Sequence, residues 1–381
     1  MLIELCRAVA AERGVAPASL PREEGAWTEF ASAAERNRLA PLAYARLKPL
    51  AENAGVPEAV LRSLRNAYGR ALRSAELYQA ELLRLLDLFG AASVPVVVLR
   101  GPGSGLRLYG DPALRPFTDL DLLTPRPGLA AAEKCLEAAG YAPLDARLPP
   151  AYFARYHLHI AYRHPAAGMM VELHHAVDHR YTPFLVDYAA VFRDAGGDGI
   201  PLPSRVHTFL LDAVHLVKHA VALPYTTRAD DALQQIAAED CLILLLDLAL
   251  QLPAVRPQWP AVRQTAEKWN VERELAAVLP PLAMLVDNAP AAPAVRPSAT
   301  ERALFRAVTA LAPALRRGRP VGLFRPVRAL DLWRYAFPGR RRLRATYRLP
   351  LVVSAPLHPL RAIAEVLVNA RAYRRHNPRR G

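Results

Sequence analysis

Long apolar runs, cysteine and a secretory leader pattern are scarce or missing in this 381-residue sequence. The longest apolar run, residues 241–252 (CLILLLDLALQL), is shorter than the roughly 18 residues of a membrane span and contains Asp247. Three scattered cysteines give neither a disulfide framework nor a cysteine-rich metal site. The opening MLIELCRAVAAERG has an early glutamate and no basic stretch, so we expect no signal peptide. We expect a cytoplasmic protein whose cysteines are reduced.

Lysine is also scarce, and the positive charge is unevenly distributed. The chain has a net charge of +14, yet residues 316–381 alone contain 17 arginines against Asp331 and Glu365. The rest is therefore nearly neutral, which disfavours nucleic acid as the main substrate. Two interpretations of the basic segment stay open: contact with an anionic partner such as a membrane surface, or a solvated tail in an arginine-rich protein.

Enough apolar sequence is present for real hydrophobic cores, at 52% of residues. The first 90 residues have helical periodicity, as in SAELYQAELLRLLDLFGAA, where Leu77, Leu82, Leu85, Leu86 and Phe89 recur at helical spacing and Gly90 suits a stop. We expect an α+β fold in which a small mixed sheet is flanked by helical regions. The expected divisions are an N-terminal helical region (1–90), a core (91–200), a helical region (201–287), a proline- and alanine-rich linker (288–301) and a basic C-terminal helical region (302–381).

The core alternates between strand and helix patterns. VPVVVL (94–99) predicts a buried strand, GSGLRLYG (103–110) a short helix, and FTDLDLL (117–123) a second strand. A helix ending at Gly140 follows, and YHLHIAYRH and GMMVELHHAV form two strands joined by the turn HPAAG. Ser204 is the expected N-cap of the next helix.

Three acids in these strands point to a metal site. Asp119 and Asp121 project from one face of their strand, because side chains alternate along it. Glu172 lies between Val171 and Leu173, where an unpaired carboxylate is costly to bury. Together the three could form an oxygen cage for Mg²⁺; exposed strand acids are the alternative. Free N–H groups of the preceding turn would bind phosphates there, at Gly101, Gly103, Ser104 and Gly105.

The order of these features resembles the nucleotidyltransferase superfamily related to DNA polymerase beta: a glycine/serine turn, an acid–apolar–acid strand and a later lone acid. More narrowly, VVVLRG, LYGDPALRPFTDLDLL and VELHH are similar to motifs of the bacterial family called uncharacterised nucleotidyltransferase. The resemblance extends to AERNRLAPLAYARL and HLVKH, and covers about residues 25–260. It implies a nucleotidyltransferase core that uses an NTP such as ATP, two Mg²⁺ ions (Mn²⁺ as an alternative) and catalytic, metal-binding acids at Asp119, Asp121 and Glu172.

Other family positions imply phosphate contacts. Arg100 stands where the family has lysine, Gly101 matches the turn glycine, and Arg115 stands at the family's arginine. Arg115 has an equal alternative, a structural ion pair with one of the two aspartates. Pro102 departs from the wider superfamily and removes one N–H donor from the turn.

Histidines accompany this site. Zinc binding by them is conceivable, but no His-x-x-x-His spacing with an acid on one helix supports it, so polar lining or packing is favoured. His174 shares the face of Glu172 and is the best candidate for a substrate contact. The six are His157, His159, His164, His174, His175 and His179.

A further helix offers His215 and His219 on one face, with packing favoured over a role in the site. Lys218 is the better candidate for a phosphate contact. GPGSGL matches neither a P-loop nor a dinucleotide fingerprint.

Taken together, we expect a Mg²⁺-dependent nucleotidyltransferase that releases pyrophosphate. Members of the family it resembles are often encoded with peptide-tailoring or exopolysaccharide enzymes, which implies a peptide, sugar phosphate or protein acceptor. Three alternatives stay open: transfer from a nucleotide-sugar, a non-catalytic nucleotide-binding module, and a basic adaptor that binds a membrane surface or nucleic acid through its C-terminal segment.

Overall fold

The computed structural model describes most of the first 293 residues. Within this range it leaves out residues 52–54, 146–151, 155–156, 179–183, 198, 221–222 and 227. Beyond residue 293 it describes only residues 295, 299, 302–303, 306, 357–361, 364, 368 and 371. The expectations for parts of the 288–301 linker and for nearly all of the basic 302–381 region therefore lie outside the described residues.

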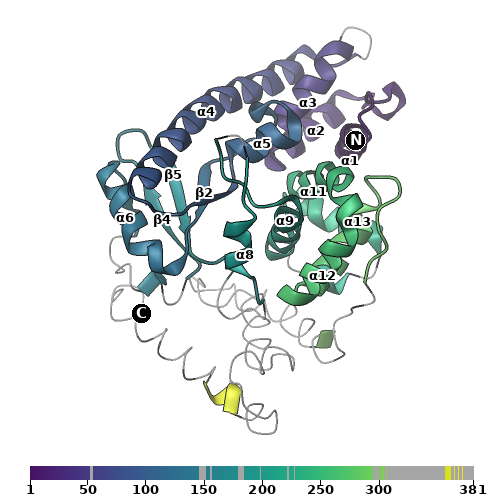
Figure 1. Cartoon of the computed structure of the whole chain (residues 1–381). Helices are drawn as coiled ribbons and strands as arrows, with labels where there is room; N and C mark the ends of the chain where they lie inside the picture. Colours follow the sequence, from purple (N-terminus) through teal and green to yellow (C-terminus); the bar gives the residue numbers. More distant parts are fainter. Residues whose placement is uncertain are drawn as a thin grey trace.

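The described chain is mainly helical around one small sheet, which confirms the expected α+β class (Figure 1). The helices before the sheet are α1 (Leu2–Ala10), α2 (Glu24–Arg36), α3 (Ala40–Leu47) and α4 (Glu58–Ala91). The core contains β1 (Val97–Arg100), α5 (Pro102–Tyr109), β2 (Asp119–Leu123), α6 (Leu129–Ala138), β3 (Ala142–Pro143), β4 (His159–Arg163), β5 (Met170–His174) and α8 (Tyr188–Arg193). The later helices are α9 (Arg205–His219), α10 (Ala229–Ala238), α11 (Leu242–Val255), α12 (Trp259–Trp269) and α13 (Glu272–Leu282).

The sheet is mixed, with strand order β1-β2-β5-β4-β3. The two central strands, β2 and β5, run parallel, and the other neighbours are antiparallel. β4 and β5 form the expected hairpin. The parallel central pair places the acids of β2 directly beside Glu172 of β5.

One face of the sheet is apolar and is covered by α4 and α6. Leu120 and Leu122 of β2 and Leu173 of β5 are buried there in one cluster with side chains of both helices. Leu77 of α4 does not belong to this face as the spacing suggested: it is 64% exposed, and the neighbouring Tyr78 is buried instead. The helix also continues past Gly90 and ends at Ala91.

Helices from both ends of the described chain share a second core. Side chains of α1 to α3 and of α9 to α13 are buried in one continuous cluster. In Figure 1, α9 lies between the sheet and the helices α11 to α13. Ser204 caps α9 as expected, by accepting a hydrogen bond from the His207 N–H. No described helix has the length and apolar character needed to cross a membrane.

Candidate active site

The three predicted acids lie together on the face of the sheet opposite α4 and α6. Asp121 is in register with Glu172 of the adjacent parallel strand, and Asp119 precedes Asp121 by two residues on the same face. Burial raises the pKa of Asp119 to about 6, and the charges of Asp121 and Glu172 add to the effect. In the part of the chain that the structure describes, the Asp119 carboxylate has no hydrogen bond or ion pair. This site therefore contains a partly buried carboxylate that no described side chain pairs with directly, although the charges of Arg38 and His174 act on it.

Arg100 reaches the acids because β1 is irregular. Val98 pairs with Leu122, whereas Arg100 pairs with Asp121, so the strand contains a bulge between them. A bulge reverses the alternation of side chains, and here it turns Arg100 toward the polar face. Its guanidinium lies 3.3 Å from Asp121 Oδ2 and donates to Asp212 Oδ1 of α9 at 3.2 Å.

His174 connects two of the acids. Its Nε2 lies 3.0 Å from Asp121 Oδ1 and 3.3 Å from Glu172 Oε2, while its Nδ1 lies 3.3 Å from the Ala176 carbonyl oxygen. All three neighbours are acceptors, so both ring nitrogens carry protons. Burial opposes this charge, but the hydrogen bonds to both carboxylates raise the pKa of His174.

The same contacts keep two carboxylates ionised. Burial alone would raise the pKa of Asp121, but the hydrogen bond and charge of His174 and the charge of Arg100 hold it well below its usual range. For Glu172, burial is likewise outweighed, first of all by the hydrogen bond from His174, and the pKa is lowered.

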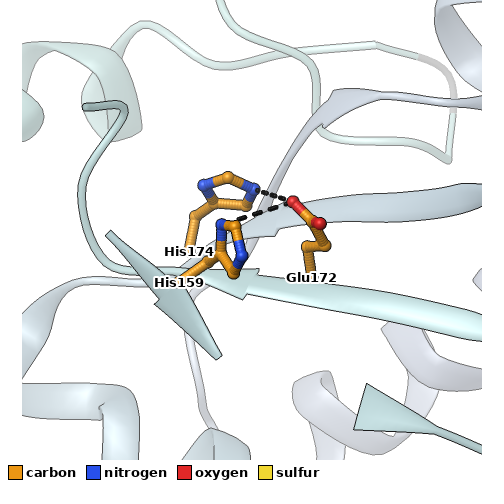
Figure 2. Close-up of side chains that lie close together, drawn as sticks. All are labelled: His159, Glu172 and His174. Carbon is orange, nitrogen blue, oxygen red and sulfur yellow. Dashed lines mark ion pairs between the residues drawn. The ribbon is translucent and has the colours of Figure 1, made fainter. Parts of the chain in front are cut away.

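His159 completes this group from β4. It pairs directly with His174 across the antiparallel strands, and its Nδ1 lies 3.3 Å from Glu172 Oε2. Figure 2 shows both imidazole rings beside the Glu172 carboxylate. Burial, together with the positive charge of His174, lowers the pKa of His159 to about 4. His159 is therefore neutral near pH 7 and has a ring nitrogen free to accept or coordinate.

The predicted phosphate turn lies next to the acids. Gly101 has φ +117° and ψ −147°, a conformation that requires glycine, and an added Cβ would lie 3.8 Å from the Asp119 carbonyl oxygen. α5 begins at Pro102, so the free N–H groups of its first turn are those of Gly103 and Ser104. Gly105 is different, because its N–H donates to the Gly101 carbonyl.

Two turn residues are also packing positions. A Cβ on Gly103 would meet Ile200 Cγ2 at 3.1 Å, and one on Gly105 would meet Pro112 Cα at 3.3 Å. Ser104 is buried. The glycines thus allow α5 to pack closely against its neighbours.

Helix α9 places cations and histidines toward the polar face. The pKa values of His215 and His219 are lowered, first by burial, and the charge of Asp121 acts on both in the opposite direction. Lys218 lowers the pKa of His159 as well as those of the two α9 histidines, so this half-buried ammonium group faces the site.

Arg38 was missed by sequence reasoning. It follows α2 in a left-handed conformation (φ 58°), it is exposed, and its charge lowers the pKa of both Asp119 and His219. The neighbouring Asn37 is buried and holds this loop by donating to the Ala237 carbonyl and accepting from the Leu242 N–H. The signal was the segment AERNRLAPLAYARL, which carried part of the family resemblance without a chemical role.

Arg115 has a different partner from either expectation. Its Nε and Nη2 donate to Asp247 Oδ2 at 2.8 and 2.7 Å, and both side chains are almost fully buried. Asp247 also accepts from the Tyr109 hydroxyl at 2.8 Å. The ion pair is structural, as one alternative proposed, but its acid is Asp247 of α11 rather than Asp119 or Asp121. Two of the three guanidinium nitrogens, Nε and Nη2, are engaged by the single carboxylate oxygen Asp247 Oδ2.

The remaining predicted histidines lie away from the acids. His157 and His175 line a cavity of about 570 Å³ beyond the carboxyl ends of β2 and β5. His164 follows β4 at its far end, where its Nδ1 accepts from the Ala167 N–H and its ring packs on Tyr141. His179 lies outside the described residues.

The donor set fits a divalent cation. Three carboxylates lie on one face of two adjacent strands, although their oxygens do not all lie within 4.8 Å of one another, and hard ions such as Mg²⁺ prefer oxygen ligands. Helix N–H groups and exposed or half-buried cations adjoin them, which suits a phosphate-bearing substrate accompanied by a metal ion.

Comparison with known proteins gives one match. The family model described as uncharacterised nucleotidyltransferase matches residues 23–284, a range that contains every site residue named above. No curated protein and no solved structure matches the chain.

Proposed function

The chain belongs to the uncharacterised nucleotidyltransferase family, and we propose that it is a Mg²⁺-dependent enzyme that moves a nucleotidyl group from an NTP, such as ATP, to a hydroxyl or phosphate acceptor. In this reaction the acceptor oxygen bonds to the α-phosphorus, the bond from that phosphorus to its bridging oxygen breaks, and pyrophosphate leaves. The observation that carries the proposal is that Asp119, Asp121 and Glu172 share one face of the central strand pair, next to the turn that begins α5.

The three carboxylates are the proposed ligands of Mg²⁺, with Mn²⁺ as a substitute. When bound, two such ions stabilise the attacking and leaving oxygens of a phosphoryl displacement. Arg100 and His174 already hold Asp121 in place, so their role is to position this ligand. Asp119, without such partners, is free to bind the ion that accompanies the triphosphate.

Glu172 is the proposed acceptor of the proton that the attacking hydroxyl loses. Its carboxylate is ionised and partly accessible, and its Oε2 faces the two histidines. His174 holds this carboxylate and that of Asp121 at a fixed separation, so it acts as a positioning residue. Its ring nitrogens contact the Asp121 and Glu172 carboxylates and the Ala176 carbonyl oxygen.

The triphosphate is proposed to bind along the start of α5. The N–H groups of Gly103 and Ser104 are donors there, and Lys218 and Arg38 supply positive charge from α9 and from the loop after α2. Arg100 adds charge, with its Nε and Nη1 already engaged by Asp212 and Asp121.

A nucleotide-sugar donor is the second candidate. Pro102 removes one N–H from the phosphate turn, which leaves fewer donors than a triphosphate would use. A diphosphate with a sugar attached needs fewer N–H donors than a triphosphate. The acceptor classes stay the same: a peptide, a sugar phosphate or a protein side chain.

Calorimetric titration of NTPs, with and without Mg²⁺, tests the proposal. Asp119→Asn is a cleaner variant than Asp121→Asn, because Asp121 also pairs with Arg100 and His174. We expect Mg²⁺-dependent binding to the wild type and to the exposed-site control Asp287→Asn, and binding at least about tenfold weaker to Asp119→Asn.

Each contrary outcome would support a different function. Binding that needs neither Mg²⁺ nor Asp119 would identify a non-catalytic nucleotide-binding module. If folded wild type binds no NTP, the same titration with nucleotide-sugars decides whether the second candidate replaces the first.

The basic C-terminal region carries a separate proposal, contact with an anionic membrane surface at the inner face of the cytoplasmic membrane. Its support is the sequence alone, with 17 arginines among residues 316–381. The full chain should sediment with vesicles that contain anionic lipid at low salt and be released at high salt. Absence of binding at low salt would remove this proposal.

A further inference from the structure

We propose that His159, Glu172 and His174 form a binding site for a transition-metal ion of the zinc type, which adjoins the all-carboxylate Mg²⁺ site and shares Glu172 with it. The ability to bind this ion rests on the geometry of the three side chains, whereas its catalytic use rests on the proposed function. The three ligand atoms lie within 4.8 Å of one another (Figure 2).

The spacing of these atoms matches tetrahedral coordination. Glu172 Oε2 lies 3.3 Å from His159 Nδ1 and 3.3 Å from His174 Nε2. Ligands bonded to zinc at about 2.0–2.1 Å in a tetrahedron lie about 3.3–3.4 Å apart. In an octahedral Mg²⁺ site, adjacent oxygens lie closer, at about 2.9 Å. Two of the three ligand separations therefore have the length that a four-coordinate ion requires.

Strand pairing brings the ligands together. His159 of β4 is directly opposite His174 of β5, and Glu172 shares the face of His174. The two imidazole rings are 4.9 Å apart between centroids and inclined at 63°, and each directs a nitrogen toward Glu172. Regular strands fix all three side chains, which is the rigidity that a metal site needs.

A second contact orients one ligand. The Nδ1 of His174 lies 3.3 Å from the Ala176 carbonyl oxygen, so Nδ1 donates and Nε2 is directed toward Glu172. Histidines that bind metals commonly donate their other ring N–H to a carbonyl or carboxylate, which fixes the tautomer and the ring plane. An ion at this site would replace the proton that Nε2 carries in the metal-free protein.

The donor types select the metal. Two imidazoles and one carboxylate are the ligands of several catalytic zinc sites, which keep a fourth position open for water or substrate. Mg²⁺ prefers oxygen donors alone. When bound, a zinc-type ion would lower the pKa of an acceptor hydroxyl coordinated at its open position. The acids of β2 remain available to Mg²⁺ and the triphosphate.

Cobalt spectroscopy on the full chain tests the site. Metal-free protein is titrated with Co²⁺ in excess Mg²⁺, and the visible spectrum is recorded, because four-coordinate Co²⁺ absorbs far more strongly than six-coordinate Co²⁺. We expect one intensely absorbing Co²⁺ per chain, displaced by Zn²⁺. His159→Ala should bind Co²⁺ at least about a hundredfold more weakly. His164→Ala, at the other end of β4, should bind as the wild type does.

Several results would overturn the inference: a weak six-coordinate spectrum in the wild type, no Co²⁺ binding, or wild-type affinity in His159→Ala. His159 is partly exposed, so His159→Gln offers a second variant should the alanine variant unfold. Mg²⁺–NTP titration of the same samples separates the two proposals. NTP binding without Co²⁺ binding refutes only the zinc-type site, and the reverse refutes only the nucleotidyltransferase proposal.

Discussion

Replacing Asp119 with asparagine should stabilise the metal-free protein while removing its metal-dependent binding. The Asp119 carboxylate is partly buried beside Asp121 and Glu172 and has no protein partner among the described residues. Ionising it in the folded state is therefore unfavourable. Asparagine has nearly the same shape and no charge, so the substitution removes the repulsion and leaves the strand intact.

The size of the effect follows from the pKa. Raising it from 3.8 to about 6 corresponds to about 3 kcal/mol of unfavourable free energy for the ionised form in the folded state. Well below pH 3.8 the carboxyl is protonated in both states, so its ionisation adds nothing to the difference between variant and wild type. Between pH 4 and pH 6 the wild type loses stability as the proton leaves, and above pH 6 the full difference remains.

The assay is urea unfolding in the presence of a chelator at several pH values, followed by thermal unfolding with and without Mg²⁺. At pH 7.5 Asp119→Asn should be more stable than wild type, by up to about 3 kcal/mol. Mg²⁺ at a hundred times its Kd should raise the free energy of unfolding of the wild type by about 2.7 kcal/mol and leave that of the variant almost unchanged. The exposed Asp287→Asn should stay within about 0.5 kcal/mol of wild type. If Asp119→Asn were no more stable than the wild type at pH 7.5, ionised Asp119 would not destabilise the folded protein. The main electrostatic argument for a cation at this site would then fail.

Three further substitutions test other parts of the site. Arg115→Met should cost about 3–5 kcal/mol in urea unfolding, because it leaves Asp247 buried without its partner. The double variant Arg115→Met/Asp247→Leu should recover most of this and bind Mg²⁺–NTP normally; lost nucleotide binding in the double variant would restore a phosphate role for Arg115. Gly101→Ala should lower the free energy of unfolding by about 1–3 kcal/mol and weaken NTP binding, since only glycine suits φ +117° and ψ −147°. An unchanged Kd for NTP would show that the turn does not bind the phosphates. Lys218→Met should weaken NTP binding about tenfold with an unchanged Tm, whereas Lys268→Met on α12 should not, and equal affinities would exclude Lys218 as a phosphate contact.

Short-range patterns were sufficient to predict the elements around the site. Alternation along residues 117–123 predicted that Asp119 and Asp121 share a face, and the same rule placed His174 on the face of Glu172. The turn HPAAG predicted the β4–β5 hairpin. These properties depend on neighbours in sequence, so the sequence contains the information directly.

Pairing between strands is a different kind of information. The zinc hypothesis was disfavoured because no helix carried a suitable histidine spacing, yet His159 and Glu172 meet across two strands. Their contact depends on hairpin register, and a shift by one residue would send His159 to the opposite face. The bulge that turns Arg100 toward Asp121 is equally invisible to periodicity, because it inserts one residue into an otherwise regular strand.

Long-range packing explains why the site needs more than the sheet. Asn37 links the end of α2 to the start of α11 through two buried hydrogen bonds, and this link sets the loop from which Arg38 approaches Asp119. Asp212 of α9 holds the far side of Arg100 and itself accepts from Gln251 of α11 at 2.8 Å. Cations that face the acids are thus positioned by helices that precede and follow the sheet in sequence, and those helices share one hydrophobic core. A sheet excised with α4 and α6 alone would keep its acids and lose the charges around them. The family match over residues 23–284 covers the sheet, these helices from α2 onward and the residues that orient the charges, and it leaves out α1.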